Sequence, residues 1–219
     1  MQRHSRWNHN IHYHPVILGA LTPSCGRVLD VGCGEGMLAA ELSRRADHVT
    51  ALDLDAAAVA SARAQSAAEN VEYRVADVFT RDLPPASFDA VVSVAVLHHL
   101  GTARGLERMR ELLRPGGTLA VVGLARPAYP RDLPWDVAGA VFSRLLRMAR
   151  PYWDSAAPQL WPPPETFRET RRIAAGVLPG SRFRRHVLWR YSLVWRKPGA
   201  PGPAAPLPSD RPTDASAGS

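Results

Sequence analysis

Three closely spaced glycines follow a short apolar run in the segment Val28–Gly36, whose residues are Val-Leu-Asp-Val-Gly-Cys-Gly-Glu-Gly. Glycine allows a sharp backbone turn and lets a ligand approach the main chain without a Cβ atom in the way. Where such a turn joins a strand to a helix, the ligand lies at the carboxyl end of the strand, beside the helix N-terminus. The segment therefore predicts a loop that binds a nucleotide-like cofactor.

The spacing of the glycines discriminates between cofactors. The dinucleotide fingerprint has its third glycine five residues after the first, but Met37 holds that position here and the third glycine is Gly36. Asp53 follows 21 residues after Gly32, where a carboxylate can accept hydrogen bonds from ribose hydroxyls. The pattern disfavours NAD and fits a nucleoside ligand without a 2′-phosphate.

Two adjacent histidines follow an apolar run farther along the chain, at His98 and His99. Because imidazole titrates near neutral pH, either ring is a candidate general base beside the cofactor crevice. The alternative is structural, with one ring packed against the following helix and the other capping a turn or solvated.

Apolar strands and helices alternate around these residues, which indicates a parallel sheet covered on both faces. Right-handed crossovers then predict a doubly wound, Rossmann-like α/β fold. The expected strands are 28–31, 48–54, 71–76, 88–94, 118–124, 183–189 and 191–195. The expected helices are 16–21, 37–46, 56–68, 106–113, 136–150 and 165–177.

Five motifs in order make residues 27–124 similar to the class I S-adenosylmethionine-dependent methyltransferases. They are the glycine loop, the acid Asp53, the triplet Ala76-Asp77-Val78, the segment 88–93 and the turn 113–119. The resemblance implies a seven-stranded, mostly parallel sheet with an antiparallel ending, and S-adenosylmethionine as the cofactor. A tight turn in a nucleotide-free α/β protein is the alternative for the loop taken alone.

The resemblance also implies roles for the matched residues. The glycine-loop backbone would lie against the methionine part of the cofactor, with Asp30 orienting its amino group. Asp53 would hold the ribose, and Asp77 with the Val78 amide would contact the adenine edge. The backbone at 93–94 would lie near the sulfonium. The expected cofactor-binding residues are Asp30, Gly32, Cys33, Gly34, Gly36, Asp53, Leu54, Asp77, Val78, Ser93 and Val94.

The first 26 residues are rich in histidine and aromatic side chains. We expect residues 1–26 to form an arm that folds over the cofactor as a lid, with Tyr13 and His14 lining the acceptor pocket. A frayed arm is the alternative. A metal ion is not expected, because the cluster lacks a paired cysteine or acidic ligand and methyl transfer needs none.

The positive charge of the chain is concentrated in one stretch. The chain has 27 basic and 20 acidic residues, and 26 of the basic residues are arginines. Residues 1–123 carry a net charge of −1, whereas residues 124–197 carry 14 basic and 5 acidic residues, a net charge of +9. Within the methyltransferase-like domain, 27–197, we expect residues 125–180 to be a helical cap insertion before the last two strands. The proline-rich tail, 198–219, is expected to be disordered.

Three interpretations of this basic segment stay open. It could form an RNA-binding patch. Residues 136–150 could instead form a basic amphipathic helix that lies on an anionic membrane or meets a lipid-like substrate. The interpretation we favour is a cap helix packed on the sheet, with its arginines in solvent.

These features predict methyl transfer from S-adenosylmethionine to an O, C or N atom of a small molecule, anionic or lipid-like acceptors included. Ser93-Val94-Ala95-Val96 stands where amino-methylating nucleic-acid enzymes carry an Asn-Pro-Pro-Tyr type motif, so nucleic acid is not the favoured acceptor. The alternatives are an RNA methyltransferase that uses the basic cap, and a cofactor-binding partner protein without activity. The sequence leaves the acceptor atom and the oligomeric state open.

The expected location is the reducing cytoplasm. Two cysteines, Cys25 and Cys33, are too few for a disulfide framework. We find no signal-like apolar run at the N-terminus and no window of roughly 18 apolar residues that would span a membrane.

Overall fold

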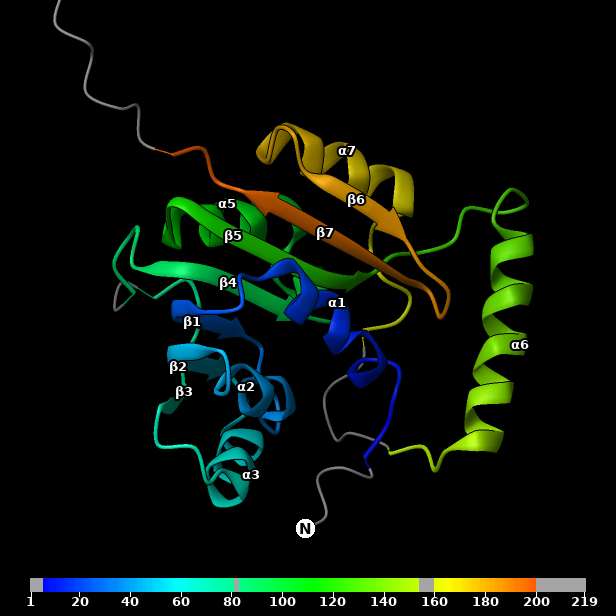
Figure 1. Cartoon of the computed structure of the whole chain (residues 1–219). Coiled ribbons are helices and arrows are strands. Elements are labelled where there is room, and N and C mark those ends of the chain that lie inside the picture. The colour runs from blue at the N-terminus through cyan, green and yellow to red at the C-terminus, as the bar shows by residue number, and fades with distance from the viewer. Residues whose placement is uncertain (1–5, 81–82, 154–159, 200–219) are drawn as a thin grey trace, which may run out of the picture.

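A computed structural model describes residues 6–80, 83–153 and 160–199. Within these ranges, seven strands form one sheet in the order β3-β2-β1-β4-β5-β7-β6 (Figure 1). The first five pair in parallel, and β7 is antiparallel to both β5 and β6. The predicted doubly wound α/β fold is therefore confirmed. The strands are β1 Cys25–Val31, β2 Ala46–Asp53, β3 Val71–Val75, β4 Phe88–Val94, β5 Leu113–Leu124, β6 Arg182–Arg185 and β7 Arg190–Arg196.

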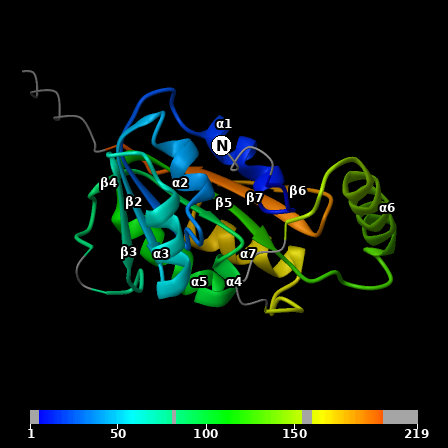
Figure 2. The same ribbon diagram turned by 90° about the horizontal axis from the view of Figure 1, so that it is seen from below.

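Helices cover both faces of the sheet (Figure 2). One group, α1, α2 and α3, packs on the face that includes Val28, and a second group, α4, α5 and α7, packs on the face that includes Leu29. Because successive side chains of a strand point to opposite faces, the apolar run of β1 supplies both cores. The helices are η2 Ile11–Tyr13, α1 His14–Ala20, α2 Met37–Leu42, α3 Ala56–Gln65, α4 Leu97–Leu100, α5 Thr102–Leu112, α6 Leu133–Ala149 and α7 Phe167–Val177.

Most element boundaries differ from the predicted ones by a few residues, and three of the larger differences are informative. The strand expected at 183–189 ends at Arg185, because Leu188 and Trp189 adopt left-handed backbone conformations with φ of 59° and 56°. β5 begins at Leu113, which pairs with Phe88 ahead of an irregularity in register. α2 ends at Leu42, four residues before the predicted end.

The two helices of the expected cap, 125–180, lie in different places. α7 packs beside α5, and its residues Phe167 and Ala174 belong to the core on the face of the sheet that includes Leu29. α6 stands at one end of the molecule (Figures 1 and 2), and Gly139 is the buried residue of this fully described helix. α6 packs against the core through Phe142 and Leu146, which are partly buried, as the favoured interpretation expects of a cap helix. The apolar side expected to pack is instead exposed, because side chains such as Val141 and Leu145 are more than half exposed.

Some sequence predictions fall on segments that the structure leaves out. The predicted disordered tail, 198–219, lies outside the described residues from position 200 onward. In the part of the chain that is described, no helix combines the length and the apolar composition needed to cross a bilayer.

Candidate functional site

A pocket of about 490 Å³ opens at the carboxyl edge of the parallel strands. The ends of β1, β2 and β4, the segment after β3 and the glycine loop all contribute to its wall. Crevices at this edge of doubly wound sheets are the usual place for ligands. The expected cofactor residues that line it are Asp30, Gly32, Cys33, Gly34, Asp53, Leu54, Asp77, Val78 and Val94.

The glycine loop needs its glycines for two different reasons. Gly32 has a φ of +75°, and a Cβ atom there would lie 2.1 Å from Cγ2 of Val96. Gly34 has a φ of +50° and would meet no atom within 4 Å, so its backbone is open to the pocket. Gly32 therefore permits the loop to pack, and Gly34 leaves room for a ligand.

Asp53 holds this loop in place. Its Oδ2 atom accepts a hydrogen bond from the Gly34 amide at 2.8 Å, and its Oδ1 atom accepts one from the Asp55 amide at 2.9 Å. The amides of Gly32 and Cys33 both donate to the Leu52 carbonyl at 2.8 Å. The end of β2 thus fixes the loop, while the Asp53 carboxylate keeps further lone pairs for hydroxyl donors.

Asp30 is a buried acid with a free acceptor. It is 1% exposed, it lines the pocket, and its Oδ2 atom has no hydrogen-bond partner among the described residues. Burial, together with the nearby Asp53 carboxylate, raises the pKa of Asp30 to about 7. A cationic ligand group placed against Oδ2 would supply the missing partner and favour the ionised form.

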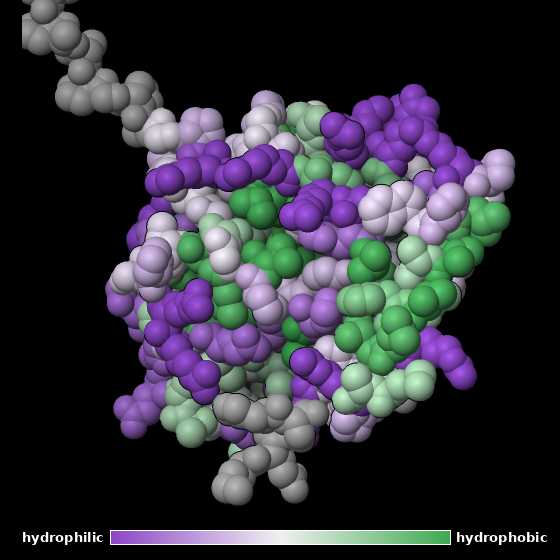
Figure 3. All heavy atoms as spheres, turned by 45° about the vertical axis from the view of Figure 1, so that its right-hand side comes forward, coloured by the Kyte–Doolittle hydropathy of each residue, from purple (hydrophilic) through white to green (hydrophobic). Residues whose placement is uncertain are grey.

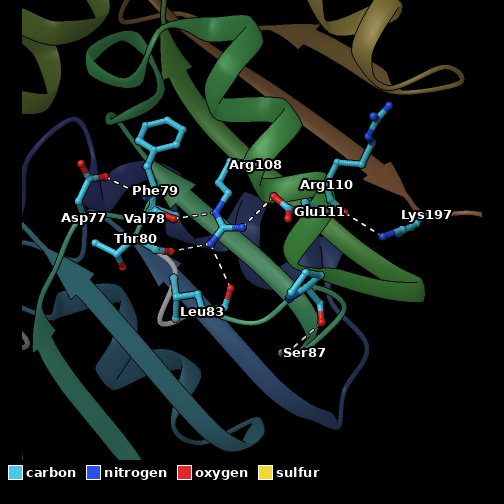
Figure 4. Close-up of polar contacts among 11 residues, drawn as sticks. Asp77, Val78, Phe79, Thr80, Leu83, Ser87, Arg108, Arg110, Glu111 and Lys197 are labelled. Carbon is cyan, nitrogen blue, oxygen red and sulfur yellow. Dashed lines mark hydrogen bonds and ion pairs between the residues drawn. The ribbon is translucent and has the colours of Figure 1, made fainter.

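The pocket wall also contains an exposed apolar side chain and a loop that is held in place by an arginine. Leu54 lines the pocket and is 68% exposed, which suits contact with an apolar ring. Asp77 accepts a hydrogen bond from the Phe79 amide at 2.9 Å. Arg108 of α5 donates to the carbonyls of Val78, Thr80 and Leu83 (Figure 4). We did not predict Arg108, although it positions the loop that carries Asp77.

Four of the predicted site residues do not line the pocket. Ser93 is buried and donates to the Val31 carbonyl at 2.9 Å. Gly36 lies next to Tyr73 of β3. Tyr13, expected in the acceptor pocket, is also buried, and its hydroxyl donates to the Val187 carbonyl at 2.7 Å. The fourth is His98.

The remaining predicted histidines take different places. His14 lines the pocket, and its Nδ1 atom lies 2.8 Å from Oε1 of Glu41. His99 also lines the pocket and is exposed. His98 is 7% exposed and lies beside His99, with 4.1 Å between the ring centroids. Of the two candidate bases, His99 is the one with access to the pocket.

The N-terminal arm reaches across the pocket edge. Arg6 donates to Glu35 of the glycine loop at 3.1 Å, and the Trp153 amide donates to the Trp7 carbonyl at 2.8 Å. His9 lies 3.1 Å from Ser143 of α6. The lining residues that we did not predict include Asn8, Asn10, Ile11 and Trp153. For Asn8 and Asn10 the sequence carried a signal, since they are polar residues inside an aromatic segment.

Burial of His98 makes the fold sensitive to acid. Burial, together with the nearby His99 and Arg190, lowers the pKa of His98 from 6.5 to about 4. Between pH 6.5 and 4, His98 is therefore mostly protonated in the unfolded chain and mostly neutral in the folded chain. This contribution to stability is complete above pH 6.5 and is lost as the pH falls toward 4. The resulting loss of unfolding free energy is about 2 kcal/mol on going from about pH 7.5 to pH 5.

We therefore expect His98→Gln to lose less unfolding free energy on acidification than the wild type. Urea unfolding of both proteins at the two pH values measures the difference. The raised pKa of Asp30 acts in the opposite direction, but it is present in both proteins and cancels. An equal decline in both would contradict the assignment.

Known proteins that resemble this chain are methyltransferases. A family model described as a methyltransferase domain matches residues 29–121. An uncharacterized methyltransferase of Mycobacterium bovis is 42% identical over 196 residues, which cover 88% of this chain and 98% of that protein. A ubiquinone biosynthesis O-methyltransferase of Xanthomonas campestris is 41% identical over 127 residues, 55% of this chain and 52% of that protein. A SAM-dependent methyltransferase of Methanosarcina mazei has a similar fold, with a TM-score of 0.58 at 17% identity, covering 85% of this chain and 98% of that chain.

Proposed function

The chain belongs to the class I S-adenosylmethionine-dependent methyltransferases, and from this membership we propose that it transfers a methyl group from S-adenosylmethionine to a small-molecule acceptor. The observation that carries the cofactor assignment is the unpartnered Oδ2 atom of Asp30 beside an open glycine loop. S-adenosylmethionine carries an ammonium group and two ribose hydroxyls. Asp30 and Asp53 supply acceptors for both.

Each of these pocket residues contacts a different part of the cofactor. Asp30 binds the amino group, and the backbone at Gly34 lies against the methionine part. Asp53 accepts hydrogen bonds from the ribose hydroxyls. Leu54 packs on the adenine ring, and Asp77 accepts from its amine. When bound, the cofactor supplies an activated methyl group on a sulfonium.

Pocket residues that are not assigned to the cofactor align the acceptor. They include Asn8, Asn10, His99 and Trp153, which line the pocket. His99, which lines the pocket, removes the proton of an acceptor that needs one. An oxygen acceptor fits this arrangement, and the ubiquinone biosynthesis enzyme named above is an O-methyltransferase. Carbon and nitrogen acceptors fit it as well.

We expect Asp53→Ala to weaken S-adenosylmethionine binding by about 1–3 kcal/mol, because the ribose hydroxyls lose a charged acceptor. The Gly34 amide also loses its partner, so the loop is less well held. Isothermal titration calorimetry measures the change in dissociation constant. Asp47→Ala is the matched control, since Asp47 is an exposed acid at the other end of β2. Unchanged affinity in Asp53→Ala would remove Asp53 from the site.

One experiment tests the proposed function as a whole. Calorimetry with S-adenosylmethionine and with NAD is followed by incubation of the enzyme with methyl-labelled cofactor and a panel of phenols, carboxylic acids, amines and an RNA. We expect binding of the first cofactor and label transfer to a small molecule. Transfer to the RNA alone would replace the acceptor assignment. Binding without transfer to any acceptor would favour a non-catalytic partner protein.

A further inference from the structure

Helix α6 presents an apolar face to solvent. Leu133, Val137, Val141, Leu145 and Met148 are between 54% and 77% exposed. Because they are spaced three or four residues apart, they form one stripe along the helix, which we call the apolar stripe. Figure 3, which brings this side forward, shows hydrophobic residues gathered over α6. Continuous exposed apolar surface of this kind marks an interaction site.

Positive charge borders the apolar stripe. Arg144 and Arg147 are exposed and line a shallow depression together with Met148 and Trp189. Within the described part of the chain, neither arginine forms an ion pair. Asp136, the one acid in the sequence of α6, accepts hydrogen bonds from Tyr129 and Trp189. The unpaired charge beside the stripe is therefore positive.

Exposed aromatic rings lie at the same end of the molecule. Trp135 is 45% exposed and Trp161 is 55% exposed. The Trp161 ring meets the Trp189 ring edge-on, with centroids 6.3 Å apart, and the Trp189 indole donates to Asp136 of α6 at 3.1 Å. Tryptophan is enriched where an apolar layer meets water, because its ring is apolar and its N–H group is polar.

We propose that α6 docks on the surface of an anionic lipid bilayer. The apolar stripe enters the boundary between headgroups and acyl chains, while Arg144 and Arg147 contact lipid phosphates. Charge complementarity supports this occupant, since Arg144 and Arg147 of α6 are exposed and Asp136 is the one acid in the sequence of the helix. A second copy would oppose two surfaces of like charge. RNA is read by hydrogen bonding and aromatic stacking, for which an aliphatic stripe has no groups.

Docking through α6 brings the pocket to the lipid surface. Ser143 of α6 contacts His9 of the arm, and the chain continues from α6 to Trp153, which lines the pocket. A lipid-soluble acceptor would then reach the site without crossing bulk water. This last step rests on the proposed function, whereas the docking itself needs neither cofactor nor acceptor.

Vesicle sedimentation without cofactor tests the docking. Vesicles of phosphatidylcholine alone are compared with vesicles made of equal parts of phosphatidylcholine and phosphatidylglycerol. We expect binding to the anionic vesicles and a decrease with added salt. The pair Val141→Ser and Leu145→Ser should lower the partition coefficient by about tenfold or more. The pair Arg144→Gln and Arg147→Gln should lower it by about fivefold per arginine.

The control removes the same charge elsewhere in the basic half. Arg171→Gln with Arg172→Gln, on the exposed side of α7, should leave binding close to that of the wild type. All substituted side chains are exposed, and the contact of Arg147 over the Tyr152 ring is a surface contact, so urea unfolding should report stability close to that of the wild type. Failure to bind anionic vesicles, or an equal loss in the α7 variant, would overturn the proposal. So would a dimer in sedimentation velocity that the Val141→Ser and Leu145→Ser variant abolishes, since a second copy would then cover the stripe.

Discussion

Replacing His99 by alanine is expected to lower the turnover number by about 10²–10⁴-fold for an acceptor that must lose a proton. His99 is exposed at the pocket wall, in helix α4, which follows β4. Its loss removes a proton acceptor without touching the glycine loop or Asp53. The dissociation constant for S-adenosylmethionine should therefore stay close to the wild-type value. Steady-state kinetics and calorimetry measure the two quantities.

Two controls separate a catalytic from a structural effect. Added imidazole should restore part of the activity of His99→Ala, because the vacated space opens to the pocket. His98→Gln should keep most of the turnover, since His98 is buried and does not line the pocket. Full activity in His99→Ala would eliminate the general-base role. A loss confined to His98→Gln would move that role to the buried ring.

Replacing Gly32 by alanine is expected to lower the free energy of unfolding by about 2–5 kcal/mol. A non-glycine residue at a φ of +75° costs about 1–2 kcal/mol. The added methyl group would lie 2.1 Å from Cγ2 of Val96, and such overpacking costs about 1–3 kcal/mol more. Urea unfolding measures the loss.

Gly34→Ala is the matched comparison. It carries a similar backbone penalty, at a φ of +50°, but its methyl group would meet no atom within 4 Å. It should destabilise the fold less than Gly32→Ala and weaken cofactor binding more, because the methyl group enters the pocket. Adding Val96→Ala to Gly32→Ala should recover part of the stability. A Gly32→Ala protein within about 0.5 kcal/mol of the wild type would contradict the packing argument.

Local patterns predicted much of the fold because its central strands are buried on both faces. The strand Phe88–Val94 was predicted with its observed bounds, since a continuous apolar run is distinctive. The early end of β6 could not be predicted. Leu188 and Trp189 hold left-handed conformations that these residue types rarely adopt, and nothing local in the sequence signals them.

The parts of the site that were missed depend on contacts across long stretches of chain. Arg108 braces a segment about 25 to 30 residues before it, and Trp153 reaches the pocket through its backbone contact with Trp7. Neither contact produces a periodic pattern of apolar residues in the sequence. The pattern of α6 likewise showed an apolar side, but periodicity cannot tell whether the fold or a partner covers it.

The reach of the N-terminal arm has a consequence for the order of folding. His9 contacts Ser143 across 134 residues, and Asn10 accepts a hydrogen bond from Arg190 across 180. Contacts of such separation form late, because the loop entropy must be lost before they stabilise the chain. The arm leaves the ribosome before the strands of the sheet and cannot be placed until nearly the whole sheet has been made. The glycine loop and β1 to β5 can assemble before then, so a nascent chain has one wall of the pocket well before the other.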